Sequence, residues 1–156
     1  MTGQQNLQPA TAEELNRHVQ EILAVLSETY HLDKLAFDAD NKCVFNIDRR
    51  FTFVAYFDHA HTGSIILNIP LGYLPEGSKR GSLLEAMMAG NYCWELTEGG
   101  TLGLDETTGM LALSYLIPLP MEEKGQIIDI VGKLVSSADY WMRQIEEAKQ
   151  GGTEAG

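Results

Sequence analysis

The sequence predicts a single α+β domain with a twisted antiparallel sheet and the element order α-β-β-β-α-β-β-α. Apolar residues at steps of three and four mark three blocks along the chain, which is typical of amphipathic helices. Two other blocks show period-two alternation, which is typical of strands. No regular βαβ alternation occurs, so the strands and helices are expected to form separate groups. The 156 residues suit one hydrophobic core better than two.

The first expected element is an amphipathic helix over residues 12–30. The preceding stretch Thr11-Ala-Glu-Glu14 has the pattern of a capping box, with Thr11 as the N-cap. The apolar residues of this helix recur on one face: Leu15, Val19, Ile22, Leu23, Leu26 and Tyr30. Residues 1–11 are polar and are expected to form a flexible N-terminus.

Alternating runs over 35–37, 43–47, 51–57 and 65–71 predict an antiparallel meander of three or four strands. The links between these runs are too short for crossover helices. Asp38–Asn41 has turn chemistry. The Arg49-Arg50 link is interpreted either as a turn or as a bend or bulge within one long strand.

A loop over 73–81 is followed by a second capping-box pattern, Ser82-Leu-Leu-Glu85, which predicts a short helix reaching Tyr92. Gly99-Gly100 interrupts the chain, and a hairpin with a turn at 105–109 follows. A long helix is expected over 121–149. The predicted folded domain therefore covers residues 12–149, and 150–156 is expected to be a flexible tail.

The charge balance narrows the classes of partner. The chain carries 22 acidic and 11 basic residues, for a net charge of −11 and a pI of about 4.6. Nucleic acid and anionic membrane surfaces are therefore disfavoured as partners. No secretory signal and no apolar run of the roughly 20 residues needed for a membrane span is present. We therefore expect a soluble, cytoplasmic protein, with Cys43 and Cys93 as buried or half-buried free thiols.

The motifs of common enzyme classes are missing from the sequence. It has no P-loop and no G-x-S-x-G nucleophile motif. His59 and His61 alternate in a loop beside Asp58, but a zinc site needs further ligands. Solvated loop histidines are favoured over a small metal-dependent enzyme, which stays as a minor alternative. The carboxylate pairs at 38 and 40 and at 105 and 106 fall in turns. We expect no enzymatic activity and no cofactor.

The supply of apolar residues exceeds what one core face needs. Residues 127–135 are apolar on more than one stripe, and neighbouring strand residues such as Val44 and Phe45 are apolar on opposite faces. Helices on both faces of the sheet or a dimer interface would explain this excess. Exposed grooves for a partner segment are the functional alternative.

Three stretches carry a resemblance to a known family. They are LAFDADNKCVFNID at 35–48, LLEAMMAGN at 83–91 and GGTLGLDETTGMLAL at 99–113. Together with the element order, small size and acidity, they make the chain similar to the class I type III secretion chaperones, the Tir chaperone family. The likeness covers about residues 12–146.

The resemblance implies a homodimeric chaperone without ATPase activity in the bacterial cytoplasm. It would bind the unfolded N-terminal segment of a secreted effector and keep it soluble and competent for export. The implied dimer contacts are Leu84, Met87, Met88 and Tyr92. The implied effector-binding residues are Val25, Leu35, Phe37, Phe45 and Ile47. A chaperone-like adaptor or regulator of another protein, unconnected with secretion, is the alternative function.

Overall fold

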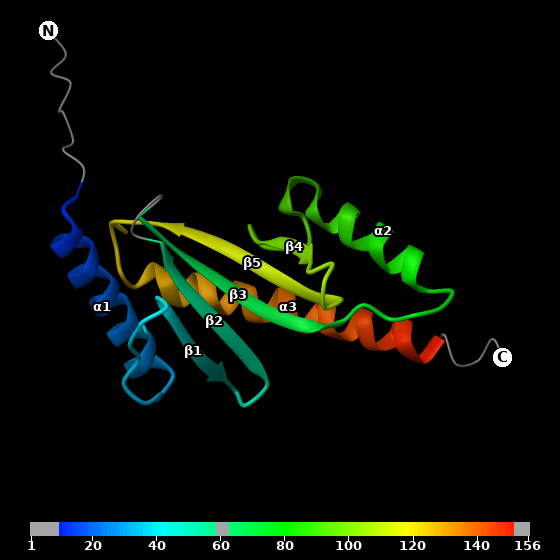
Figure 1. Ribbon diagram of the computed structural model, residues 1–156, viewed down its shortest axis with the longest axis horizontal. Helices are drawn as coiled ribbons and strands as arrows, with labels where there is room; N and C mark the ends of the chain where they lie inside the picture. Colours follow the sequence, from blue (N-terminus) through cyan, green and yellow to red (C-terminus); the bar gives the residue numbers. More distant parts are fainter. Residues whose placement is uncertain (1–9, 59–62, 152–156) are drawn as a thin grey trace, which may run out of the picture.

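A computed structural model describes residues 10–58 and 63–151 and has the predicted α+β element order (Figure 1). The elements are α1 (Ala12–Thr29), β1 (Lys42–Ile47), β2 (Phe51–Asp58), β3 (Ser64–Tyr73), α2 (Arg80–Asn91), the 3-10 turn η1 (Tyr92–Trp94), β4 (Thr101–Leu104), β5 (Met110–Pro118) and α3 (Gln126–Gly151). The histidine loop at 59–61 lies outside the described residues, so the metal alternative is not tested by the structure.

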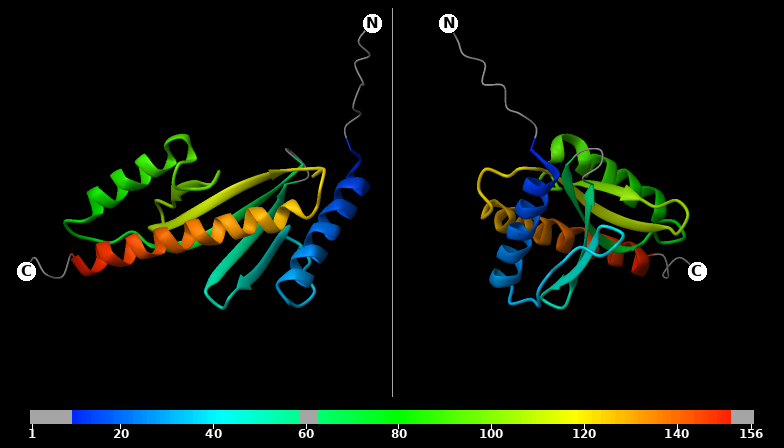
Figure 2. Two further views of the ribbon diagram at one scale, coloured as in Figure 1. Left: turned by 180° about the vertical axis from the view of Figure 1, so that it is seen from behind. Right: turned by 60° about the vertical axis from the view of Figure 1, so that its left-hand side comes forward.

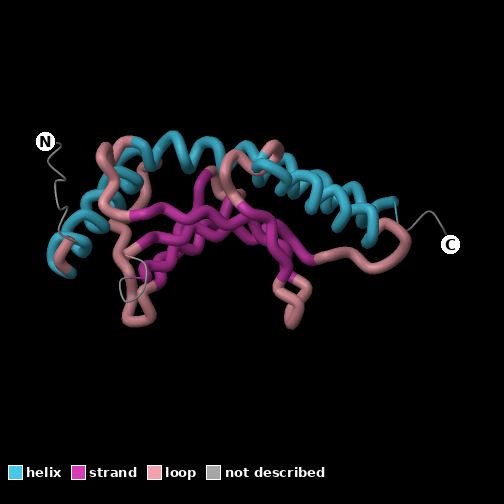
Figure 3. Tube along the Cα trace, turned by 90° about the horizontal axis from the view of Figure 1, so that it is seen from above, coloured by secondary structure: helices cyan, strands magenta, loops and turns pink. Residues whose placement is uncertain are grey.

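The five strands form one antiparallel sheet in the order β1-β2-β3-β5-β4. The helices lie along one side of the sheet and leave its other face open (Figure 3). α3 runs the length of the sheet, α1 lies at the end near β1 and β2, and α2 lies at the end near β4 (Figures 1 and 2). No helix in the described part of the chain combines the length and apolar character that a membrane span needs.

The core lies between the sheet and the helices. Every second residue of a strand faces the helices. Phe45 of β1 and Phe53 of β2 both face this way, and their rings stack with centroids 5.1 Å apart. α3 contributes a fully buried stripe that includes Val131, Leu134 and Trp141. The expected alternation and helical spacing therefore identify the inward faces correctly.

The capping box before α1 is confirmed. The Glu14 backbone N–H donates to Thr11 Oγ1 at 3.2 Å, and the Thr11 N–H donates to Glu14 Oε2 at 2.8 Å. This backbone hydrogen bond lowers the pKa of Glu14, because it favours the charged carboxylate. Two donors at the start of the helix are thereby satisfied.

Residues 35–37 do not form a strand, so the four-strand alternative is wrong. The segment instead packs against α1, where the Leu35 N–H donates to Ser27 Oγ at 3.4 Å. Leu35 and Phe37 are half-buried against the core. Their alternation with polar neighbours marks contact with a helix and not pairing in a sheet.

The second capping box is also wrong. α2 begins at Arg80, and Ser82 lies inside its first turn, with its hydroxyl donating to the Lys79 carbonyl at 3.2 Å. α3 begins at Gln126, five residues later than expected, because 121–125 forms part of the link from β5. Cys43 is buried as expected, whereas Cys93 is exposed.

The link at 48–50 is a tight turn between β1 and β2, not a bend in one strand. The Arg50 N–H donates to the Ile47 carbonyl at 3.1 Å, and the two central residues, Asp48 and Arg49, have φ values of 53° and 55°. This pair of positive φ values is that of a type I′ turn, whose preferred sequences end in glycine. Because position 49 is arginine and not glycine, the sequence lacks the pattern by which this turn is usually predicted.

Replacing Arg49 with glycine is therefore expected to raise the free energy of unfolding by about 0.5–1 kcal/mol. Glycine removes the left-handed strain of roughly 1–2 kcal/mol but loses more backbone entropy on folding. Urea denaturation would measure the change. Arg50→Gly is the matched control and should be destabilising, because the Arg50 side chain forms an ion pair with Asp139. Equal effects of the two substitutions would contradict the strain argument.

Candidate functional site

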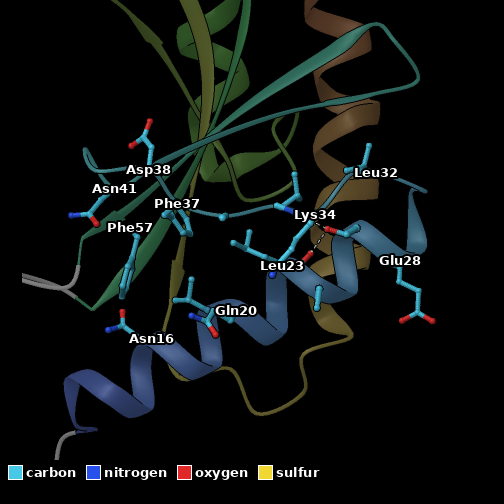
Figure 4. A pocket seen from close by; sticks show the side chains of 15 residues that line it. Asn16, Gln20, Leu23, Glu28, Leu32, Lys34, Phe37, Asp38, Asn41 and Phe57 are labelled. Atoms are coloured by element: carbon cyan, nitrogen blue, oxygen red, sulfur yellow. Dashed lines mark hydrogen bonds between the residues drawn. The ribbon is translucent and has the colours of Figure 1, made fainter.

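A cavity of about 780 Å³ opens between α1, the segment 32–41 and the end of β2 (Figure 4). We call it the α1 groove. Its lining residues are Asn16, Val19, Gln20, Leu23, Ala24, Ser27, Glu28, Leu32, Lys34, Leu35, Ala36, Phe37, Asp38, Asn41 and Phe57.

The helical wall of the α1 groove follows from the spacing of α1. Its members recur at steps of one, three and four and therefore share one side of the helix. Ser27 joins this wall to the opposite one, since its hydroxyl donates to the Leu23 carbonyl at 2.9 Å and accepts the Leu35 N–H. The irregular segment is thereby held beside the helix without covering the cavity.

The opposite wall depends on a turn fixed by a carboxylate. Asp38 Oδ1 accepts the backbone N–H groups of Asp40 and Lys42 at 2.9 and 3.0 Å. The turn places Phe37 against Phe57, with ring centroids 5.8 Å apart. These two rings form an apolar surface at this end of the groove.

The two ends of the α1 groove differ in chemistry. Asn16, Gln20 and Asn41 surround the end where Phe57 lies, whereas Leu23 and Leu32 lie toward the other end (Figure 4). Side-chain amides offer both donors and acceptors, as a peptide main chain does. The groove therefore suits an extended polypeptide with an apolar anchor.

The predicted effector-binding residues divide between this groove and the core. Leu35 and Phe37 line the groove. Val25 is half-buried against the core and is not among the lining residues. Phe45 and Ile47 are each only 3% exposed beneath the sheet and are not accessible to a partner in this conformation.

Sequence reasoning missed several lining residues. The helical spacing places Val19 and Leu23 on the apolar face of α1, and each also borders the cavity at the edge of the buried stripe. Phe57 is buried and lines the groove at the end where Asn16 and Asn41 lie. The polar lining residues carry no motif. Their position on the helix beside the apolar stripe is the signal that could have found them.

A second apolar surface lies on the far side of the molecule. Met88 and Tyr92 are each 72% exposed, and the neighbouring exposed apolar residues are Trp94, Leu96 and Leu104. We call this set the α2 patch. Of the predicted dimer contacts, Leu84 is half-buried and Met87 is buried within the subunit. Met88 and Tyr92 are therefore the two that can meet a partner directly.

Among the described residues, no three histidine, cysteine, aspartate or glutamate side chains gather as a metal site would require. The charged groups at the α1 groove, Glu28, Lys34 and Asp38, come from its rim (Figure 4).

Comparison with known proteins gives a family match and a fold match. Residues 21–142 match the family described as the Tir chaperone protein (CesT) family. No curated protein sequence matches the chain. Among solved structures, the HopA1-SchA chaperone-effector complex contains a chain that is 22% identical, with a TM-score of 0.63, covering 89% of this chain and 99% of that one.

Two further solved structures agree on the fold. A chain of the ExsC-ExsE complex is 17% identical, with a TM-score of 0.70, covering 84% of this chain and 96% of that one. A chain of the ExoU-SpcU complex from the type III secretion system of Pseudomonas aeruginosa is 13% identical, with a TM-score of 0.65. The match covers 81% of this chain and 98% of that one. At these identities, the likeness establishes a shared architecture over nearly the whole domain.

Proposed function

Because the chain belongs to the Tir chaperone protein (CesT) family, we propose that it is a homodimeric chaperone of the bacterial cytoplasm. It binds the unfolded N-terminal segment of a type III secreted effector and keeps that segment soluble and competent for export. The observation that carries this proposal is the α1 groove, an open cavity lined by both apolar and polar side chains, with amide side chains at one end. Solved relatives of the same fold are found in complexes with effectors, which supports the assignment.

The α1 groove can hold an extended segment by two kinds of contact. One apolar side chain of the segment would enter between Leu23 and Leu35, where it removes apolar surface from water. The amides of Asn16 and Gln20 would bond the main chain near Phe57. β1 is an edge strand of the sheet and lies next to this wall, so it can accept an added strand. Main-chain recognition suits a chaperone, because it demands little of the segment's sequence.

Binding of this kind needs no covalent step, and we propose that the protein is not an enzyme. The bound segment loses conformational entropy as it becomes ordered. Burial of its apolar anchors offsets that loss and also keeps those anchors from aggregating. The net charge of −11 keeps the dimers apart while apolar surface is exposed.

Replacing Phe37 with aspartate is expected to weaken binding of the effector segment at least about 30-fold, because a charge would be buried without a partner at a cost of about 2 kcal/mol or more. Co-purification of the tagged protein from its native host, followed by mass spectrometry, would identify the partner. Titration with that partner's N-terminal segment would then measure the affinity.

Tyr73→Asp is the matched control, because Tyr73 is exposed and lies outside the α1 groove. It should bind as the wild type does. Capture of a folded protein with no link to secretion would overturn the proposed role and favour the adaptor function. Unchanged affinity of the Phe37 variant would overturn the assignment of the groove.

A further inference from the structure

We propose that the contact between His18 and Met121 is a pH-sensitive latch that holds α1 against the link between β5 and α3. The Met121 backbone N–H donates to His18 Nε2 at 2.7 Å, across 103 residues of sequence. Met121 is buried, and His18 is half-buried on the side of α1 that faces the link. The contact depends on the imidazole of His18.

The hydrogen bond requires neutral imidazole. Nε2 accepts only when it carries no proton, so the ring proton must be on Nδ1. Protonation would convert Nε2 into a donor that faces another donor. The Met121 N–H would then be left without its acceptor in a partly buried position, which is unfavourable. Acidification should therefore open the contact.

The surroundings of His18 together lower its pKa and so favour the closed latch at neutral pH. Burial is the main cause that lowers the pKa of His18, and Lys124 of the link lowers this pKa further. Within α1, Glu21 raises the pKa of His18 and Arg17 lowers it. Lys124 also forms an ion pair with Glu21, a second connection between the link and α1. These three are the charged groups that act on His18 within the described ranges.

The direction of the pH dependence follows from this lowered pKa. The unfolded chain takes up a proton on His18 near pH 6.5, whereas the folded protein resists until a lower pH. The contribution of the latch to stability is therefore complete above about pH 6.5. It is lost as the pH falls from there through the pKa of the folded protein.

The latch matters for the α1 groove because His18 lies on the same helix as several of the lining residues, although it does not line the groove itself. Asn16, Val19 and Gln20 flank it in sequence and border the cavity. A helix moves as a rigid element, so release of α1 from the link would shift this whole wall. That consequence for binding rests on the proposed function, whereas the latch itself does not.

Hydrogen exchange of the full chain without any partner would test the latch. Protection of residues 12–29 and of the Met121 amide, corrected for intrinsic rates, would be compared at about pH 7.5 and about pH 5. We expect protection in the wild type to fall about three- to tenfold relative to α3, the effect of losing one hydrogen bond. His18→Gln keeps an acceptor and does not titrate, so its protection should stay unchanged.

His31→Gln is the matched control, because His31 follows the same helix, is exposed and takes no part in the contact. It should behave as the wild type does. A wild-type chain with no selective loss in α1, or a His18→Gln variant with the same loss, would overturn the latch. NMR titration of the wild type gives a second measurement. The Met121 amide must titrate together with His18, and independent behaviour would also overturn the proposal.

Discussion

Replacing Trp141 with alanine is expected to lower the free energy of unfolding by about 3–5 kcal/mol, the cost of a large cavity in a core. Trp141 is 1% exposed on α3, and its indole N–H donates to the Leu96 carbonyl at 2.9 Å. Its ring also lies against Gly90 of α2, where any Cβ would clash with it. One side chain thus joins α3 to both α2 and the segment after η1.

Thermal unfolding would measure this change as a fall of roughly 6–20 °C in the melting temperature. Trp141→Phe keeps an aromatic ring but removes the donor, so it should cost less than the alanine variant. Gly90→Ala should also destabilise, by about 1–3 kcal/mol, because it overpacks the same contact. Tyr73→Ala, at an exposed aromatic residue, is the control and should change stability by less than about 1 kcal/mol. A Trp141→Ala loss no larger than this control would contradict the central role of the indole.

The periodic parts of the fold could be predicted from the sequence, because burial there imposes a regular pattern. The inward faces of β1 and β2 alternate strictly, and the buried stripe of α1 recurs at helical spacing. The errors in the predicted elements occur where a residue occupies a position that is unusual for its residue type. Arg49 occupies a left-handed turn position, and Ser82 lies inside a helix that its sequence would cap.

The α1 groove could be predicted only in part, for a related reason. Leu35, Phe37, Phe45 and Ile47 have the same apolar character in the sequence, yet Leu35 and Phe37 line the groove whereas Phe45 and Ile47 lie in the core. Apolar periodicity gives the side of an element that faces other protein atoms. It does not say whether those atoms belong to this chain or to a partner. Only the placement of α1 beside residues 32–41 separates the two cases.

For the α2 patch, too, apolar character does not say whether the residues contact this chain or a partner. Introducing two negative charges should distinguish these cases. Replacing Met88 and Tyr92 together with aspartate is expected to convert a dimer of about twice 17.3 kDa into a monomer. Met88 of α2 and Tyr92 at the start of η1 are both exposed, whereas Met87 is buried within the subunit. In a two-fold symmetric interface each substitution appears twice, so four carboxylates would be brought close together. Their desolvation and repulsion would exceed what the apolar contact contributes.

Light scattering at several micromolar concentrations would measure the masses, with Leu116→Asp as the control. Leu116 is an exposed apolar residue on the open face of the sheet, far from the α2 patch in sequence and on a different surface. Its replacement should leave the dimer intact, which separates loss of a specific interface from a general gain of charge. Circular dichroism should show both variants folded, because neither site is buried in the subunit. A wild-type chain that is monomeric, or a double variant that stays dimeric, would show that the exposed side of α2 serves a different contact. The α1 groove would then have to bind its segment without a second copy nearby.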